Sequence, residues 1–167
     1  MTASPVLIAS NRISGTSTSG IDWAVPNTYK HLWIVAATGD TFSSNFPNHS
    51  IRFNNNSDSN SYRWQQASFE SSRSVAQYVN NYGGLGNAAQ GTNYTKLSSI
   101  YVFDYNSTTA HKNWLVTGGL GYTSGYPGTV DIYGGRWANT AAVTSVQIFA
   151  QTAFTNGSLW QVYGLVG

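Results

Sequence analysis

The sequence predicts an all-β protein, a jelly-roll-like antiparallel β-sandwich with one short helix. Short runs rich in β-branched and aromatic residues recur along the chain, separated by clusters of Gly, Asn, Ser and Pro. Several of these runs alternate in polarity with a period of two, which is typical of strands. The length of 167 residues fits one domain that can bury a core without disulfides or metals.

Nine strands are expected, followed in chain order from the N-terminus. They lie at residues 6–12, 29–37, 50–53, 62–69, 97–105, 111–117, 129–137, 143–150 and 159–166. Residues 1–28 are interpreted as an N-terminal strand and arm, and residues 29–167 as the sandwich, within a single globular domain. The segment 14–20, rich in Ser, Thr and Gly, is expected to be a loop or a flexible arm.

Some of these strands are apolar on both faces. In the run 29–37, Leu32 and Ile34 share one face, while Trp33 and Val35 share the other. A strand of this kind is covered on both sides. The core supplies one cover, and a second sheet edge, a long loop or a partner subunit supplies the other.

One segment departs from the β pattern. Side chains at the helical spacing i, i+3, i+4 and i+7 are Val75, Tyr78, Val79 and Tyr82. This spacing predicts a short helix over residues 73–82, with the following Gly83-Gly84 as its C-cap. Residues 82–94 are then expected to form a long surface loop.

Charged residues make up only 8% of the chain, and the formal net charge is +2. No basic run is present, so the sequence has no footprint of nucleic-acid binding. The chain has no cysteine, which excludes disulfides and thiolate metal sites. No apolar stretch is long enough for a bilayer, and the N-terminus lacks a secretion signal, so we expect an intracellular origin without membrane insertion.

The ionisable residues predict no enzyme and no cofactor. A glycosidase needs two carboxylates facing one bond, and only Asp104 and Asp131 could lie on neighbouring strands. His31, His49 and His111 are scattered, and no nucleophile elbow accompanies them. We interpret these acids as turn caps, ion-pair partners or solvated groups, and the histidines as structural or interface residues.

Two further patterns resemble ligand loops. The oxygen-rich run 54–60 lacks the alternating carboxylates of an EF-hand and is interpreted as a polar hairpin loop. Whether this loop, or the loop at Asp40, binds an ion stays open. The glycine runs 83–86 and 118–121 lack the Lys-Ser/Thr of phosphate loops and are interpreted as turns that need positive φ.

Aromatic residues are abundant, with six Trp, eleven Tyr and seven Phe. Such side chains stack on sugars, pack at interfaces or fill the core. The residues predicted to make interface or glycan contacts are Tyr122, Tyr126, Tyr133 and Trp33.

The C-terminal third carries a resemblance to a known family. Residues 135–146 read G-R-W-A-N-T-A-A-V-T-S-V, and residues 154–165 read F-T-N-G-S-L-W-Q-V-Y-G-L. This pattern resembles small virion structural proteins of tailed bacteriophages, of the head-decoration and fibre-tip type. Shorter similarities lie at 29–32, 51–55, 104–105 and 112–114, whereas 73–91 and the segment before Tyr29 have no counterpart. The resemblance implies a jelly-roll fold and supplies no catalytic residues.

Three functions follow as hypotheses. The first is a capsid decoration or cement protein, a homo-oligomer, favoured as a trimer, bound to the major capsid protein or another virion protein. The second is a tail-fibre or receptor-binding tip that recognises a host surface glycan, which the aromatic loops favour and the lack of a shaft disfavours. The third is a glycan-active enzyme on the same scaffold. The first two place the protein in a virion assembled in the host cytoplasm.

Overall fold

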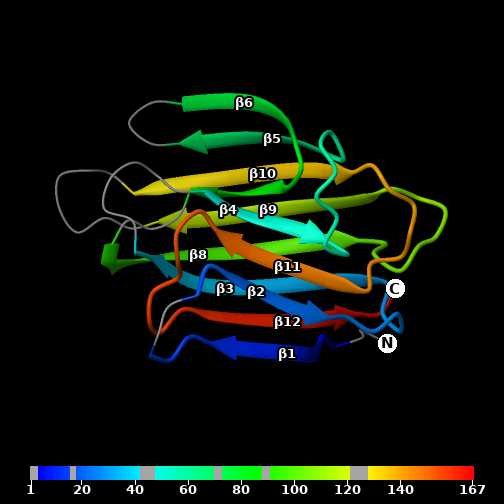
Figure 1. The fold of residues 1–167 in the computed structure, drawn as a ribbon, viewed down its shortest axis with the longest axis horizontal. Helices are drawn as coiled ribbons and strands as arrows, with labels where there is room; N and C mark the ends of the chain where they lie inside the picture. The colour runs from blue at the N-terminus through cyan, green and yellow to red at the C-terminus, as the bar shows by residue number, and fades with distance from the viewer. Residues whose placement is uncertain (1–3, 16–17, 42–47, 70–72, 88–90, 121–127) are drawn as a thin grey trace.

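The protein is all-β and consists of two packed antiparallel sheets (Figure 1). The computed structural model of the chain describes residues 4–15, 18–41, 48–69, 73–87, 91–120 and 128–167. Within these ranges it has twelve strands and no helix. Figure 1 looks down the shortest axis of the molecule, and the smaller sheet lies in front of the larger one.

The larger sheet has eight strands. In spatial order they are β1 (Val6–Arg12), β12 (Leu159–Leu165), β3 (His31–Asp40), β8 (Gly91–Phe103), β9 (Lys112–Leu120), β10 (Thr129–Trp137), β5 (Tyr62–Phe69) and β6 (Arg73–Asn80). The smaller sheet has four. They are β2 (Gly20–Ala24), β11 (Ser145–Ala150), β4 (Asn48–Phe53) and β7 (Gly83–Asn87).

Each of the nine expected strands has a counterpart in the structure, which confirms the all-β prediction. The sequence analysis missed β2, β6 and β7. The predicted surface loop 82–94 is wrong, because β7 and the first residues of β8 fall within it. In the segment interpreted as an N-terminal arm, β1 pairs with β12 and β2 pairs with β11.

The helix predicted over residues 73–82 is also wrong. This segment is the edge strand β6, which pairs with β5 so that Val75 lies opposite Ala67 and Val79 lies opposite Arg63. Residues four apart share a face in a strand as well as in a helix. The ring of Tyr78 stacks on Trp64 at a centroid distance of 4.1 Å, a cross-strand aromatic contact. This pairing decides the structure against the helical spacing.

The core lies between the sheets and is rich in aromatic rings. Phe53 of the smaller sheet packs against Tyr62, Trp114 and Trp137 of the larger one. Gly83 and Gly135 make room for the ring of Trp114, because a Cβ at either position would overlap it. The aromatic core therefore depends on small residues in the strands beside it.

The two glycine runs were predicted to be turns, and this is wrong for most of their length. Gly83 and Gly84 lie in β7, and Gly118 and Gly119 lie in β9. Of the glycines described in these runs, only Gly86 has a positive φ, of 100°. The other three provide space for neighbouring side chains and backbone.

The polar loop between β4 and β5 follows the hairpin interpretation. Asn54 has a φ of 53°, and its side chain donates to the carbonyl of Ala142 at 2.8 Å. Its Oδ1 accepts from the backbone amides of Thr144 at 2.7 Å and Ser145 at 3.1 Å. The amide of Asn54 thus ties this loop to the segment that leads into β11.

Candidate interaction surface

The outer face of the larger sheet carries large apolar side chains that remain exposed. Val75 is 71% exposed, Leu97 62% and Val130 57%. An antiparallel sheet with one solvated face normally presents polar residues there. We call one set of these residues the apolar patch: Phe69, Val75, Leu97, Leu115, Val130 and Ile132.

Strand register makes most of the apolar patch continuous. Val130 on β10 lies opposite Phe69 on β5. Ile132 lies opposite Ala67, and Ala67 lies opposite Val75 on β6. Ile132, Val75 and Leu115 also line one shallow depression. A partner surface would therefore meet apolar side chains across three neighbouring strands.

An aromatic row crosses the same face on β12, β3 and β8. Trp33 lies between Tyr163 and Tyr101, with ring centroids 5.3 Å and 6.0 Å away, and Tyr101 is 6.3 Å from Phe103. The indole Nε1 of Trp33 donates to Ser99 Oγ at 2.8 Å, which fixes the ring on the sheet. The rings are half-buried, and Phe103 is exposed. We call these four residues the aromatic row.

The charge on this face is positive. Arg63 and Arg136 lie directly opposite one another on β5 and β10, and neither forms an ion pair with a residue that the structure describes. The carboxylates in the eight strands are Asp40 and Asp131, and both are buried. Like charges facing each other across a sheet are unfavourable without an external counter-charge. The pair therefore favours a partner that brings carboxylates or other anionic groups.

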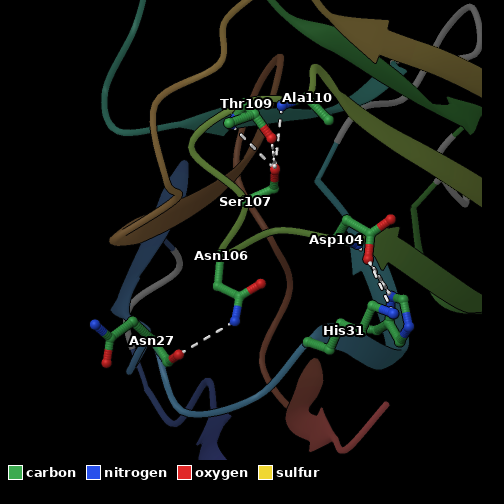
Figure 2. A network of polar contacts seen from close by, with 8 residues as sticks. Asn27, His31, Asp104, Asn106, Ser107, Thr109 and Ala110 are labelled. Carbon is green, nitrogen blue, oxygen red and sulfur yellow. Dashed lines mark hydrogen bonds and ion pairs between the residues drawn. The ribbon is translucent and has the colours of Figure 1, made fainter.

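A hydrogen-bonded loop closes one end of the aromatic row (Figure 2). The backbone amide of Asp104 donates to His31 Nδ1 at 3.0 Å, and the ring of His31 packs edge-on against Phe103 at 5.9 Å. Farther along, Asn106 donates to the carbonyl of Asn27 at 3.3 Å. These bonds connect the loop after β8 to the segment before β3.

The four residues predicted to make contacts have different outcomes. Trp33 lies at the centre of the aromatic row. Tyr133 points into the core and is 0% exposed, with its ring 5.8 Å from Trp64, so it offers no surface to a partner. Tyr122 and Tyr126 lie outside the described residues. The alternation of β10, which turns Ile132 outward, necessarily turns Tyr133 inward.

The carboxylates considered for catalysis do not share a cleft. Asp131 is fully buried, whereas the side chain of Asp104 is 49% exposed in the turn after β8. Among the described residues there is no group of three His, Cys, Asp or Glu side chains that could hold a metal ion.

Sequence reasoning missed a set of fully buried ionisable groups in the core. Lys96 Nζ lies 3.1 Å from Asp131 Oδ2, and both side chains are 0% exposed. Burial lowers the pKa of Lys96, while the opposing charge and hydrogen bond of Asp131 raise it. His49 Nε2 lies 3.8 Å from Asp40 Oδ2, and burial lowers the pKa of His49. The available signal was register, because Lys96 falls on the inward-facing side of β8 with Ile100.

Comparisons with known proteins found no matching family model, no matching curated protein and no matching solved structure. Among the described residues, there is no helix of the length and apolar character required to cross a bilayer.

Proposed function

We propose that this chain is a non-enzymatic structural protein of a tailed-bacteriophage virion, acting as a capsid decoration protein that stabilises the head through protein–protein contacts. The observation that carries the proposal is the exposed apolar patch on the outer face of the larger sheet. A contiguous apolar patch on a protein surface marks an interaction site. The resemblance of the C-terminal third to virion proteins supplies the setting.

The chemistry of the face favours protein partners. Beside the apolar patch, Arg63 and Arg136 offer two guanidinium groups without a described ion-pair partner. Arg is enriched at protein interfaces because its planar fork binds carboxylates in two places. The partners in this proposal are further copies of the chain, favoured as a trimer, and the major capsid protein.

The proposal includes a jelly-roll connectivity for the sandwich. Its support is the strand order: β1, β12, β3 and β8 face β2, β11, β4 and β7. In each group, strands from the start of the chain alternate with strands from its later part, as in two interleaved Greek keys. Strands β5 and β6, and strands β9 and β10, then form two hairpin additions on the edge beyond β8.

Self-association is tested with one charge on each of two faces. Wild-type protein and the Ile132→Glu and Ala24→Glu variants are compared by sedimentation velocity, with circular dichroism as the check of folding. Ile132 belongs to the apolar patch, whereas Ala24 is exposed on β2 of the other sheet. We expect a wild-type oligomer that Ile132→Glu dissociates and Ala24→Glu leaves intact. A wild-type monomer at every concentration contradicts the oligomer.

The location is tested by electron cryomicroscopy of the intact virion. We expect density for this chain on the capsid shell, with the outer face of its larger sheet against neighbouring subunits. Density only at the distal end of a tail appendage rejects the decoration role.

The aromatic row favours a second candidate, a receptor-binding tip for a host surface glycan. Tyr and Trp rings held on a sheet are suited to stacking on sugars. On a glycan array, Trp33→Ala should then abolish binding, while Phe149→Ala, a half-buried aromatic on β11, should not. An array on which wild-type protein binds nothing removes this candidate.

A further inference from the structure

Lys96 and Asp131 are placed for a reaction with each other. We propose that the folded protein joins them by an amide bond between Lys96 Nζ and Asp131 Cγ, an intramolecular isopeptide cross-link. The Nζ atom lies 3.1 Å from Asp131 Oδ2, within the range of reacting atoms held in a near-attack geometry. The amine therefore stands next to the carboxyl carbon to which that oxygen is bonded.

The partner groups of Asp131 fit an amide better than a permanent carboxylate. Its Oδ1 is buried and has no hydrogen-bond partner among the residues that the structure describes. A buried carboxylate is stable only when several donors satisfy its oxygens. The carbonyl oxygen of an amide is uncharged and loses far less when it is left with few partners.

Glycines make the space in which the two side chains meet. Lys96 on β8 and Asp131 on β10 are separated by β9, and Lys96 reaches Asp131 over Gly118, where a Cβ would lie 3.1 Å from Lys96 Cε. From the other sheet Gly86 covers the pair, and a Cβ there would overlap Lys96 Nζ and lie 3.2 Å from Asp131 Oδ2. Gly86 holds a φ of 100°, a conformation that favours glycine.

The surroundings exclude water and favour the uncharged amine. Lys96 and Asp131 are both 0% exposed, and the ring of Tyr133 lies 5.9 Å from Lys96 Nζ. Burial lowers the pKa of Lys96, which increases the share of the nucleophilic form. A dry site also prevents the reverse reaction, because hydrolysis of the amide needs water.

The reaction balances without an external reagent. Transfer of one proton from Lys96 to Asp131 along their hydrogen bond gives the amine and the carboxylic acid. The amine lone pair attacks Cγ, the new C–N bond forms, and the C–O bond of the acid hydroxyl breaks. The nitrogen gives up one proton to that hydroxyl, and one water leaves. No oxidation or reduction takes place.

The cross-link would connect the two strands on either side of β9. It would close a covalent loop between positions 35 residues apart in the sequence. A cross-link of this kind restricts the unfolded chain and holds the sheet under force. The inference depends on the core alone and not on the proposed virion function.

The test is the mass of the wild-type protein. Folded protein is incubated at neutral pH, denatured, and measured intact by mass spectrometry. We expect a mass lower than the sequence mass by one water, with normal removal of Met1 allowed for. A full mass after incubation overturns the proposal, and this readout does not depend on any variant folding.

Peptide mapping locates the bond. Trypsin cannot cleave after a Lys96 that is joined to Asp131, so peptides 74–112 and 113–136 should appear as one branched species. Cleavage after Lys30, whose partner Asp104 is exposed, should be normal and serves as the internal control. Separate peptides 74–96 and 97–112, or a water loss confined to one linear peptide, contradict the cross-link.

Two variants give the expected chemistry a second readout. Asp131→Asn keeps the geometry but presents an amide, so the cross-link should release ammonia in place of water. Asp131→Ala removes the electrophile, so its mass should equal the sequence mass. An unchanged water loss in Asp131→Ala overturns the assignment to this pair.

Discussion

Two lysine–aspartate pairs in this protein occupy opposite environments. Lys30 and Asp104 are 3.8 Å apart, with side chains that are 54% and 49% exposed. Lys96 and Asp131 are 3.1 Å apart and 0% exposed. The residue types are the same, so any difference between the pairs arises from their surroundings.

The comparison shows how burial changes the meaning of an ion pair. In water the attraction of two charges is weak and is screened by salt. In the core each charge loses its hydration, and removal of one partner leaves the other uncompensated. The buried pair is therefore a point of fragility and of chemistry, whereas the exposed pair is neither.

The largest effect is expected from Lys96→Met, which keeps most of the side-chain volume and removes the charge. Asp131 would then be a buried carboxylate without its cation, and we expect a loss of about 3–5 kcal/mol in the free energy of unfolding. Urea denaturation followed by tryptophan fluorescence measures this loss. The double variant Lys96→Met/Asp131→Leu should recover part of it, because an apolar pair needs no counter-charge. A single variant as stable as wild type contradicts the fragility argument.

The next effect concerns the cover of the buried pair. Gly86→Ala would add a Cβ that overlaps Lys96 Nζ, at a positive φ of 100°. Gly157→Ala is the matched control, because Gly157 has a φ of 89° and nothing lies within 4 Å of the added Cβ. We expect the control to lose about 1–2 kcal/mol from backbone strain alone, and Gly86→Ala to lose about 1–3 kcal/mol more from overpacking. Equal losses in thermal or urea unfolding would show that the cover is not tight.

Sequence patterns predicted the fold class because alternation and turn residues are local signals. The runs at Tyr62–Phe69 and Thr129–Trp137 were located with their bounds unchanged. The edge strand β6 was misread, because Val75 and Val79 share a face in a helix and in a strand alike. Only pairing with β5, which is a long-range property, separates the two possibilities.

The site was less predictable than the fold. Trp33 was identified on the outward-facing side of its strand, whereas Tyr133 was placed at an interface although it belongs to the core. A single sequence does not show which face of a strand meets the other sheet when both faces are apolar. Lys96 and Asp131 were missed for the same reason, because their proximity depends on the register across β9.

A third prediction uses pH to probe a second buried group, His49. Burial lowers its pKa below the ordinary value of 6.5, and the nearby charge of Lys96 lowers it further, against the raising effects of Asp40. Above pH 6.5 the neutral imidazole stays unprotonated in both the folded and the unfolded chain. Below it the unfolded chain takes up a proton that folded His49 does not, so stability falls by up to about 1.4 kcal/mol per pH unit until the lowered pKa is passed.

The measurement is the free energy of unfolding between neutral and mildly acidic pH. His49→Gln should flatten the pH dependence relative to wild type, because the titrating group is gone. His111→Gln is the control, since His111 is exposed, and its curve should match that of wild type. If the wild-type and His49→Gln curves are parallel, His49 does not couple protonation to folding.

The smallest effect is expected from Lys30→Met, the same substitution as in the buried pair. The stem of Lys30 packs against Gly167, and methionine preserves this contact while removing the charge. Because both partners of the ion pair are half-exposed, the change in the free energy of unfolding should lie within about 1 kcal/mol. The difference from wild type should shrink further in high salt, since screening already weakens the wild-type pair. A loss as large as that of Lys96→Met would mean that burial is not what separates the two pairs, and the contrast on which the cross-link argument depends would lose its physical basis.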